Sequence, residues 1–554
     1  MKTDSVETTK KSLRLNKSMT RTKVALIAIL LVSFLLSNYT NMTGSNWVIH
    51  PDDHEAYVLG AHLKETGQLS IDDPKNTLFE YPVFNPAGAA FYNRMTTPKR
   101  ALGIYFVTAA GLFLGDQGPF YLVPLFGFLA MLFLFKLVEL IMDEKKALLA
   151  TFLVALSAPF LYWNNMLFAN IPGLAFLIMG MYFLLRIAYG KDVRLRSYLF
   201  STFFFGLAVW MRYEMLLVIV LLFPIVIGRR EFFRLKRFAV GLLLLIIVLA
   251  PIGLLNSKLY DSPLGTGYSN TNTTQVKAGV NSGKTNSNAM GISRLYRRFL
   301  KNLLSPDVRK MYDNANNYLL RPLPMVLLAG LLGLVSALLD RRRNRSFAVA
   351  MLLVGIVWTY YVLNGSLWVG GGGSASSFVR YLLIVYVILA IFAPVFLDRL
   401  KPAVGGGAYR ALLVIFIVSF LVLQITVLIG GPFGLAQTSN LKADFKCINE
   451  YFASAPENAV VVASLYSKAI TSRSVFSVSN IKSKDWFAVT VSYIRNLLKR
   501  GYDVYLMEAP GYSSMFENLS NFITEKGKGL QVQTVTALPM RTASDQVERV
   551  VLVE

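Results

Sequence analysis

The sequence predicts an α-helical polytopic membrane protein that ends in a small α/β domain. Hydrophobic residues make up 54% of the 554-residue chain, a larger share than a typical soluble protein carries. Apolar runs of about 16 residues or more recur along the chain, and runs of this length are typical of membrane-spanning helices. After Gly430 the long apolar runs give way to short β-rich runs that alternate with helical patterns.

The strong basic excess indicates that the chain contacts a membrane surface. Lysine and arginine number 56 against 32 acidic residues, which leaves a net charge of +24. Such a charge also suits nucleic-acid binding, but the excess is spread over short loops between apolar runs. We therefore expect anionic lipid as the partner, and no nucleic acid. The single cysteine, Cys447, excludes an intramolecular disulfide and a cysteine-rich metal site.

The N-terminal 23 residues form a polar, basic tail, which the positive-inside rule keeps in the cytoplasm. The first span, residues 24–39, therefore runs outward. A cleaved signal peptide is the alternative, because a basic segment precedes a short apolar core. We favour a retained span, since no small-x-small cleavage site precedes the polar stretch at 38–46.

Residues 101–114 are apolar but short for a span. If they crossed the membrane, the basic loops downstream would lie outside, against the positive-inside rule. We therefore interpret them as a juxtamembrane or re-entrant helix within one long external loop, residues 40–118.

The count gives about eleven transmembrane helices in a membrane domain of residues 24–430. An odd number places the C-terminal domain, residues 431–554, on the outer face of the plasma membrane. The other ten spans are predicted at 119–141, 147–163, 172–189, 197–211, 213–227, 238–255, 323–339, 347–363, 378–397 and 411–429. In the C-terminal domain we predict strands within 459–465, 502–507, 532–538 and 547–553, and a helix over 485–500 that Gly501 ends.

The first external loop opens with the most informative stretch of the chain, residues 47–57. It contains three acidic residues, Asp52, Asp53 and Glu55. A helix from Pro51 towards Gly67 would have proline and glycine in their favoured places. The acids then lie in its first turn, where the helix dipole stabilises the ionised form. Carboxylates so close to a membrane are usually functional; ordinary helix capping is the alternative.

A second long external loop is predicted at residues 256–322. Within it, residues 292–304 combine apolar residues at helical spacing with a basic face that contains Arg294, Arg297 and Arg298. We expect a helix on the outer membrane surface. Its basic face suits either a general lipid anchor or a site for the phosphate of a lipid substrate.

The order of these parts resembles that of the GT-C glycosyltransferases, in particular glycosyltransferase family 39, with its protein O-mannosyltransferases and aminoarabinose transferases. The resemblance covers roughly residues 24–397. The family's Pro-Asp-Glu-x-x-Tyr motif is matched by Pro51, Asp53, Glu55 and Tyr57. Asn170-Ile171-Pro172 stands where the family often has Asp followed by Pro, residues 206–214 resemble its Gly-Leu-Ala-x-x-x-Arg-Pro-Glu stretch, and residues 380–383 its Arg-Tyr-Leu-Leu segment.

The resemblance implies transfer of a sugar from a polyprenyl-phosphate donor to a protein, lipid or glycan acceptor on the outer face of the membrane. It implies that Asp53 takes the catalytic-acid position, with Asp52 and Glu55 in support. The expected substrate-binding residues are Tyr57, Asn170, Arg212, Arg380 and Tyr381, with the basic face of residues 292–304. For the two arginines, snorkelling to the interface is the alternative.

Two further interpretations stay open at this stage. His50 and His54 flank the acids, but the chain has only three histidines and no metal-ligand set is visible, so no cofactor is assigned. A transporter of a lipid or small solute would also carry charges in a membrane domain. Charges at the outer boundary favour the transferase, whereas charges in the middle of the spans favour transport.

Overall fold

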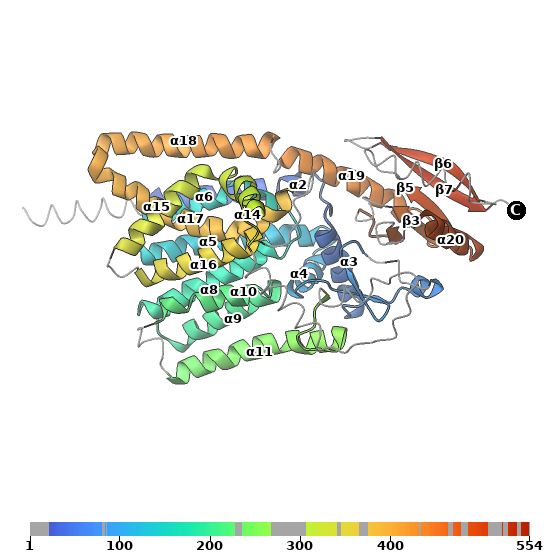
Figure 1. The fold of residues 1–554 in the computed structure, drawn as a ribbon, viewed down its shortest axis with the longest axis horizontal. Helices are drawn as coiled ribbons and strands as arrows, with labels where there is room; N and C mark the ends of the chain where they lie inside the picture. The colour runs from blue at the N-terminus through green and yellow to red at the C-terminus, as the bar shows by residue number, and fades with distance from the viewer. Residues whose placement is uncertain are drawn as a thin grey trace, which may run out of the picture.

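The computed structural model describes residues 21–79, 84, 86–227, 235–267, 306–340, 345–364, 375–430, 434–463, 469–477, 486–507, 523, 530–539 and 544–552. It has a bundle of long helices at one end and a β-sheet at the other (Figure 1). The helices α3 (Pro51–Thr66) and α4 (Gly103–Leu112) lie between the two.

Six helices in the described part of the chain are long and apolar enough to cross a membrane. They are α5 (Gly118–Ile141), α8 (Asn170–Ala188), α11 (Leu235–Tyr260), α16 (Arg345–Asn364), α17 (Ala375–Val404) and α18 (Gly406–Gly430). Two bent pairs raise the number to eight. The predicted multi-pass membrane fold is confirmed.

The remaining predicted spans appear as shorter or broken helices. The first is a helix over residues 21–37, and α9 (Leu195–Met211) is 17 residues long. The span predicted at 213–227 is α10 (Met215–Leu221) followed by the single turn η2 (Phe223–Ile225). The segment at 101–114 contains α4, which has only 10 residues and is mostly buried, so it is too short to cross the membrane as a regular helix.

Two spans are sharply bent, and one side chain contacts both bends. The first bend, of 63°, lies between α6 (Glu144–Ala155) and α7 (Ala158–Asn164), and the second, of 101°, precedes α15 (Pro324–Leu339). Gln424 of α18 accepts a hydrogen bond from the Ala158 amide at 2.9 Å and donates to the Pro322 carbonyl at 3.2 Å. Backbone groups freed at a break inside a membrane need such partners, so Gln424 stabilises both bends.

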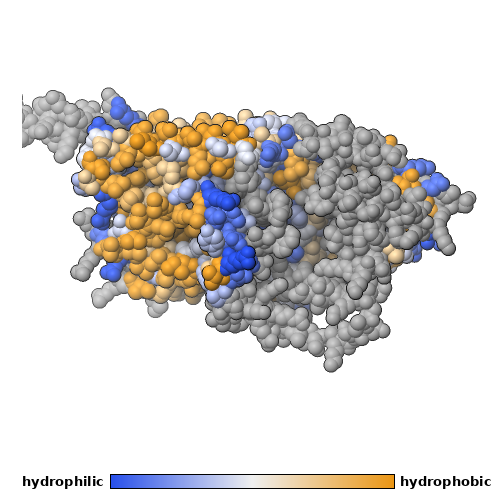
Figure 2. Space-filling model, turned by 45° about the horizontal axis from the view of Figure 1, so that its top comes forward, coloured by the Kyte–Doolittle hydropathy of each residue, from blue (hydrophilic) through white to orange (hydrophobic). Residues whose placement is uncertain are grey.

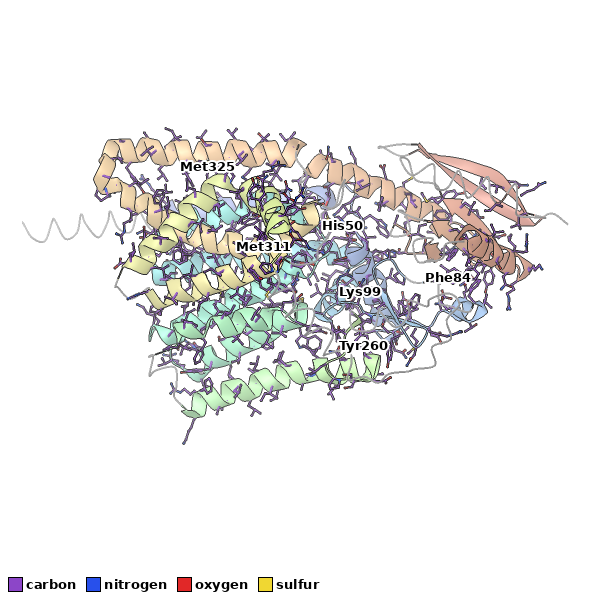
Figure 3. All side chains as sticks on the ribbon, viewed as in Figure 1. His50, Phe84, Lys99, Tyr260, Met311 and Met325 are labelled. Carbon is purple, nitrogen blue, oxygen red and sulfur yellow. The ribbon has the colours of Figure 1, made fainter. Side chains whose placement is uncertain are left out.

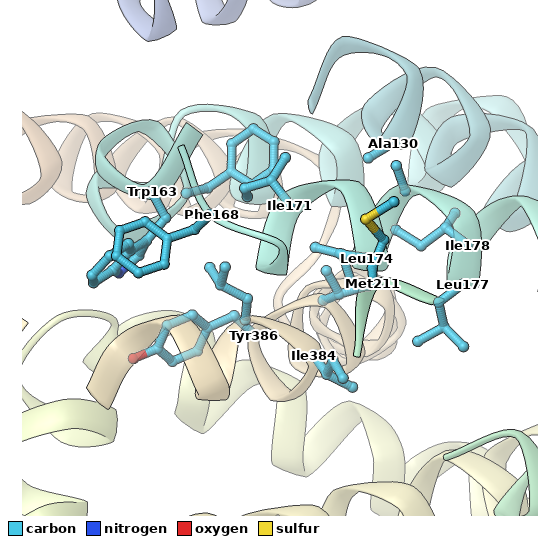
Figure 4. Packing of buried hydrophobic residues seen from close by; sticks show 14 of the residues in the cluster. Ala130, Trp163, Phe168, Ile171, Leu174, Leu177, Ile178, Met211, Ile384 and Tyr386 are labelled. Atoms are coloured by element: carbon cyan, nitrogen blue, oxygen red, sulfur yellow. The ribbon is translucent and has the colours of Figure 1, made fainter. Parts of the chain in front are cut away.

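The surface and the interior of the bundle are both apolar. Figure 2 shows a largely hydrophobic surface over the described helices at this end. Large apolar side chains are also exposed on individual helices, such as Ile246 of α11 and Val418 of α18. Lipid tails would cover such faces. Inside, Trp163 and Phe168 lie beside the first turns of α8, across from Tyr386 of α17 (Figure 4).

The C-terminal part is an α/β fold, as predicted. Its five strands have the order β4-β3-β5-β7-β6, with β3 parallel to β4 and β5, and β7 antiparallel to β5 and β6. The strands are β3 (Ala459–Ala463), β4 (Ser474–Ser477), β5 (Asp503–Met507), β6 (Leu530–Pro539) and β7 (Ser544–Leu552). The helix α20 (Trp486–Lys499) lies in the predicted segment, and Gly501 follows it with a φ of 80°. Only β4 was not predicted, because its short, serine-flanked sequence has no long apolar run.

The C-terminal part docks directly on the first external loop. The helix α19 (Leu435–Ala453) follows α18 and runs to the sheet (Figure 1). The indole of Trp47 donates to the Ala469 carbonyl at 2.8 Å, and Phe84 forms an antiparallel bridge with Phe476 of β4. Figure 3 shows His50, Lys99 and Tyr260 in the region between bundle and sheet. This loop includes η1 (Pro74–Leu78), β1 (Ala90–Tyr92) and β2 (Met95–Thr97), and α2 (Tyr39–Met42) stands at its start.

Candidate active site

The helix α3 begins and ends where the sequence predicted. Pro51 is its first residue, and Gly67 ends it in the left-handed conformation with a φ of 72°. The carboxylate of Asp53 accepts hydrogen bonds from the amides of Ile49 at 3.1 Å and His50 at 2.7 Å. Because these donors precede the helix, Asp53 holds the entering chain against the first turn.

Asp53 is therefore occupied by main-chain contacts. It is 1% exposed. Burial raises its pKa, while the two amides and the Lys442 ammonium oppose that rise. This geometry is that of the capping alternative, and within the described chain it is Asp52 and Glu55 that form the ion pairs with Arg100 and Arg380.

Asp52 lies between two guanidinium groups. It forms ion pairs with Arg100 and, at 2.8 Å, with Arg380. Burial alone would raise its pKa, but the charges of Arg100 and Arg380 hold the pKa of Asp52 at about 2. Its side chain is 15% exposed, so Asp52 is an ionised and accessible carboxylate.

Glu55 fixes Arg100 from the opposite side of the ion-pair cluster. It is fully buried, pairs with Arg100 and accepts hydrogen bonds from the Lys99 amide at 2.6 Å and from the Tyr105 hydroxyl. Burial raises the pKa of Glu55, and Arg100 acts against that rise. Since Arg100 contacts both Asp52 and Glu55, it joins α3 to the segment that leads into α4.

Arg380 lies in an aromatic pocket at the start of the apolar part of α17. Its guanidinium carbon is 4.6 Å from the ring centre of Phe168 and 5.6 Å from that of Trp163. The Nη2 atom donates to the Tyr381 hydroxyl at 3.2 Å. Among the described residues, its buried Nε has no hydrogen-bond partner. A guanidinium surrounded by rings, with a nitrogen that has no hydrogen-bond partner among the described residues, suits the binding of an anion.

Arg212 and Asn170 complete the surroundings of Arg380. The guanidinium of Arg212 lies 4.5 Å from the ring centre of Tyr381 and forms an ion pair with Glu214 at 3.4 Å. The amide of Asn170 donates to the Arg380 carbonyl at 3.1 Å. The structure thus brings Asp52, Glu55, Arg212, Arg380, Tyr381 and Asn170 together in one contiguous cluster.

Four expected substrate-binding residues are not placed in this cluster. Tyr57 packs against Trp47 and Phe120, with ring centres 5.4 Å and 5.9 Å away, and its hydroxyl lies 3.5 Å from the Asp116 carbonyl. Tyr57 therefore packs α3 against Trp47 and Phe120. The other three, Arg294, Arg297 and Arg298, lie outside the described residues.

Arg100, Trp163 and Phe168 were not among the predicted site residues. Arg100 lies 48 residues from Asp52, a separation that carries no periodic signal. The predicted topology could have identified Arg100, because Arg100 and the three acids lie in the same predicted external loop, residues 40–118. In the described part of the chain, no three His, Cys, Asp or Glu side chains are grouped as metal ligands. His50 packs on Trp163 and Phe168, and His54 contacts the Ile470 carbonyl.

Comparison with known proteins shows that the fold of the chain is shared with solved structures. Residues 101–254 match the family model described as dolichyl-phosphate-mannose-protein mannosyltransferase. ArnT from Cupriavidus metallidurans, bound to undecaprenyl phosphate, is similar with a TM-score of 0.57 and 14% identity, over 95% of this chain and 97% of that one. The apo oligosaccharyltransferase of Archaeoglobus fulgidus is similar with a TM-score of 0.51 and 13% identity, over 89% of this chain and 71% of that one. No curated protein sequence matches the chain.

These similarities confirm the resemblance to the GT-C glycosyltransferases. At 13% and 14% identity the shared property is the fold, and function has to be argued from the site itself.

Proposed function

We propose that this chain is a membrane glycosyltransferase that transfers a sugar from a polyprenyl-phosphate donor to an acceptor at the outer face of the membrane. The observation that carries the proposal is the ion pair between the accessible carboxylate of Asp52 and the ring-held guanidinium of Arg380. The shared fold with ArnT bound to undecaprenyl phosphate supports it, as does the mannosyltransferase family match.

The reaction needs a group that takes a proton and cations that hold the leaving phosphate. In our proposal, the acceptor atom attacks the anomeric carbon of the sugar. The bond from that carbon to the phosphate oxygen breaks, and the polyprenyl phosphate leaves with the bonding electrons. Asp52 receives the acceptor's proton, while Arg380, aided by Arg212, binds the departing phosphate through parallel hydrogen bonds.

The ion pairs of Asp52 make its basicity depend on whether the donor is bound. Without donor, Arg100 and Arg380 neutralise Asp52 and keep it a weak base. When a phosphate engages Arg380, the hold of that guanidinium on Asp52 weakens and the basicity of the carboxylate rises. This proposal gives Asp52 the role that the family motif had suggested for Asp53, because Asp53 is bonded to the amides of Ile49 and His50.

The position of the charges favours a transferase over a transporter. Asp52, Glu55 and Arg100 lie outside the candidate spans of the described chain, and Arg380 lies within the first two turns of α17 (Ala375–Val404), away from its middle. Charges that serve transport are expected near the middle of the spans. We also propose the orientation inferred from loop charges, in which residues 24–430 form the membrane domain of a plasma-membrane protein, the N-terminus is cytoplasmic and residues 431–554 are external.

The activity can be tested with membranes that contain or lack the chain, incubated with radiolabelled polyprenyl-phosphate sugars. We expect labelled sugar to be transferred to a cell-envelope acceptor only in membranes that contain the chain. Asp52→Asn should abolish this transfer. Failure of the wild-type chain to consume any polyprenyl-phosphate sugar would argue against the proposed function.

The orientation has a separate test. Cys447 is replaced, and single cysteines are introduced at Ser282 or Ser520, which lie in the two segments assigned to the outside. Both should react with an impermeant thiol reagent in intact cells, and protection of both would overturn the proposed topology.

A further inference from the structure

Another buried cation, Lys442 of α19, lies near the start of α3 but outside the Asp52 cluster. It is 0% exposed. Its ammonium group donates to the Asn165 carbonyl at 2.6 Å, to the Asn46 side-chain oxygen at 2.9 Å and to the Thr40 hydroxyl at 3.3 Å. An ammonium has three donors, and here all three contact neutral oxygens.

Burying this charge is costly, so its surroundings must be specific. A buried ion costs several kcal/mol unless its hydrogen bonds are satisfied. The ring centre of Phe120 lies 5.8 Å from the ammonium and adds a cation–π contact. Lys442 therefore constrains the three segments that supply its acceptors, because movement of any of them would leave a buried donor unsatisfied.

Two of these segments carry the candidate active site. Asn46 lies in the irregular stretch that enters α3 and leads to Asp52. Asn165 follows Trp163 and precedes Phe168, the two rings that face Arg380. The third segment is tied in as well, since the Thr40 hydroxyl donates to the Asn165 side-chain oxygen at 2.8 Å.

We infer that Lys442 is a positioning residue of the active site. It fixes the distance between two segments: the one that leads to Asp52 and the one that carries Trp163 and Phe168. Because Lys442 belongs to α19, sugar transfer then depends on the docking of α19. Lys442 touches neither reacting group, so it acts through its hydrogen bonds to Asn46 and Asn165 and through its charge, which faces the Asp53 carboxylate at the start of α3. This inference rests on the proposed function, because it assigns a role in the same reaction.

The same helix offers a matched control. Lys446 lies one turn further along α19, and its ammonium donates to the Gly44 carbonyl at 3.0 Å. Its side chain is 34% exposed and lies 3.9 Å from the carboxylate of Glu450 on the same helix; in the described part of the chain it makes no hydrogen bond to the loop that contains Asn165. Lys446→Met therefore removes a lysine contact between α19 and the entering chain and leaves the link to Asn165 in place.

The test compares Lys442→Met, Lys446→Met and wild type, all full-length and purified in the same detergent. For Lys442→Met we expect kcat per folded molecule to fall by about tenfold or more, because small misplacements of catalytic groups cost this much. The KM for the polyprenyl-phosphate sugar should change by less than about threefold, since Arg380 remains. Lys446→Met should keep kcat close to the wild-type value.

Hydrogen exchange gives a readout that does not depend on activity. Lys442→Met should speed amide exchange both in residues 44–50 and in residues 165–168, whereas Lys446→Met should affect the first segment alone. If Lys442→Met is not recovered in folded form, Lys442→Gln, which keeps neutral donors, is judged by the same criteria.

An unchanged kcat in Lys442→Met, or an equal loss in Lys446→Met, would overturn the role of Lys442 while the proposed function stands. Absence of transfer by the wild type would instead overturn the proposed function.

Discussion

Two buried polar clusters meet at the start of α3, and they handle charge in opposite ways. In the first, Asp52 and Glu55 share Arg100, and Asp52 also pairs with Arg380. In the second, the hydrogen bonds of Lys442 within the described part of the chain all go to neutral oxygens, and the opposite charge of Asp53 acts on it without a direct ion pair. The first cluster has charges of both signs and one carboxylate that reaches solvent, whereas the ammonium of the second is fully enclosed.

This difference separates groups that can react from groups that hold others in place. A substrate phosphate can replace Asp52 as the partner of Arg380 only if the phosphate can reach that guanidinium. Asp52 then keeps its ion pair with Arg100. A fully enclosed ammonium bound to three fixed oxygens cannot exchange without opening the fold. We therefore assign chemistry to the Asp52 cluster and positioning to the Lys442 network.

The largest effect is expected for Asp52→Asn. The change removes the charge with little change in shape, so transfer should fall by about 100-fold or more, the scale of a lost general base, while the protein stays folded. Single-turnover rates with saturating donor, normalised to the folded fraction, measure this. Near-normal turnover would break the comparison, because the accessible carboxylate would then have no chemical role.

Arg380→Lys should have the next largest effect. Lysine keeps the charge but offers a point charge in place of a planar fork, so kcat/KM for the donor should fall about tenfold, with a loss that extra donor only partly restores. Arg196→Lys is a suitable control, since that side chain is 58% exposed and pairs with Asp192, outside the cluster. Coincident rate curves for Arg380→Lys and wild type would leave only a snorkelling role for Arg380.

Asp53→Asn should affect stability more than rate. Asparagine can still accept one of the two amide hydrogen bonds, so we expect a stability loss of about 1 kcal/mol, as for other capping residues. The rate per folded molecule should fall only a few-fold. Thermal unfolding in detergent, run beside the Asp52→Asn measurement, makes the contrast direct. A rate loss as large as that of Asp52→Asn would reverse the two assignments.

The smallest effect on transfer is expected for Gln424→Leu. This change leaves the Ala158 amide and the Pro322 carbonyl without their partner, and unsatisfied buried groups cost about 1–3 kcal/mol each. The melting temperature should therefore drop, while kcat per folded molecule stays within about twofold of wild type. A large loss of kcat at unchanged stability would mean that the bend between α6 and α7 controls the geometry of the active site.

Local signals in the sequence were sufficient for the bounds of α3. Proline at its first position and glycine after its last both act within one helical turn, and the structure places both ends as expected. The spans, too, follow from composition, because a membrane requires long apolar helices. The strand β4 was missed, since parallel pairing with β3 supplies what its short sequence does not.

The choice between neighbouring acids needed the tertiary structure. Successive residues on a helix point about 100° apart, so Asp52 and Asp53 face different surroundings although their sequence context is nearly the same. Only the fold brings Arg100 and Arg380 to one of them and the amides of Ile49 and His50 to the other.

By itself, then, the sequence determined a multi-pass helical protein with an α/β end and an acid-rich helix beside the membrane, because these features depend on local periodicity and capping. The tertiary structure decided which carboxylate is paired with arginine and that Lys442 links α19 to the site. Those outcomes depend on burial and on partners distant in the chain, and a pattern of neighbouring residues contains no information about either.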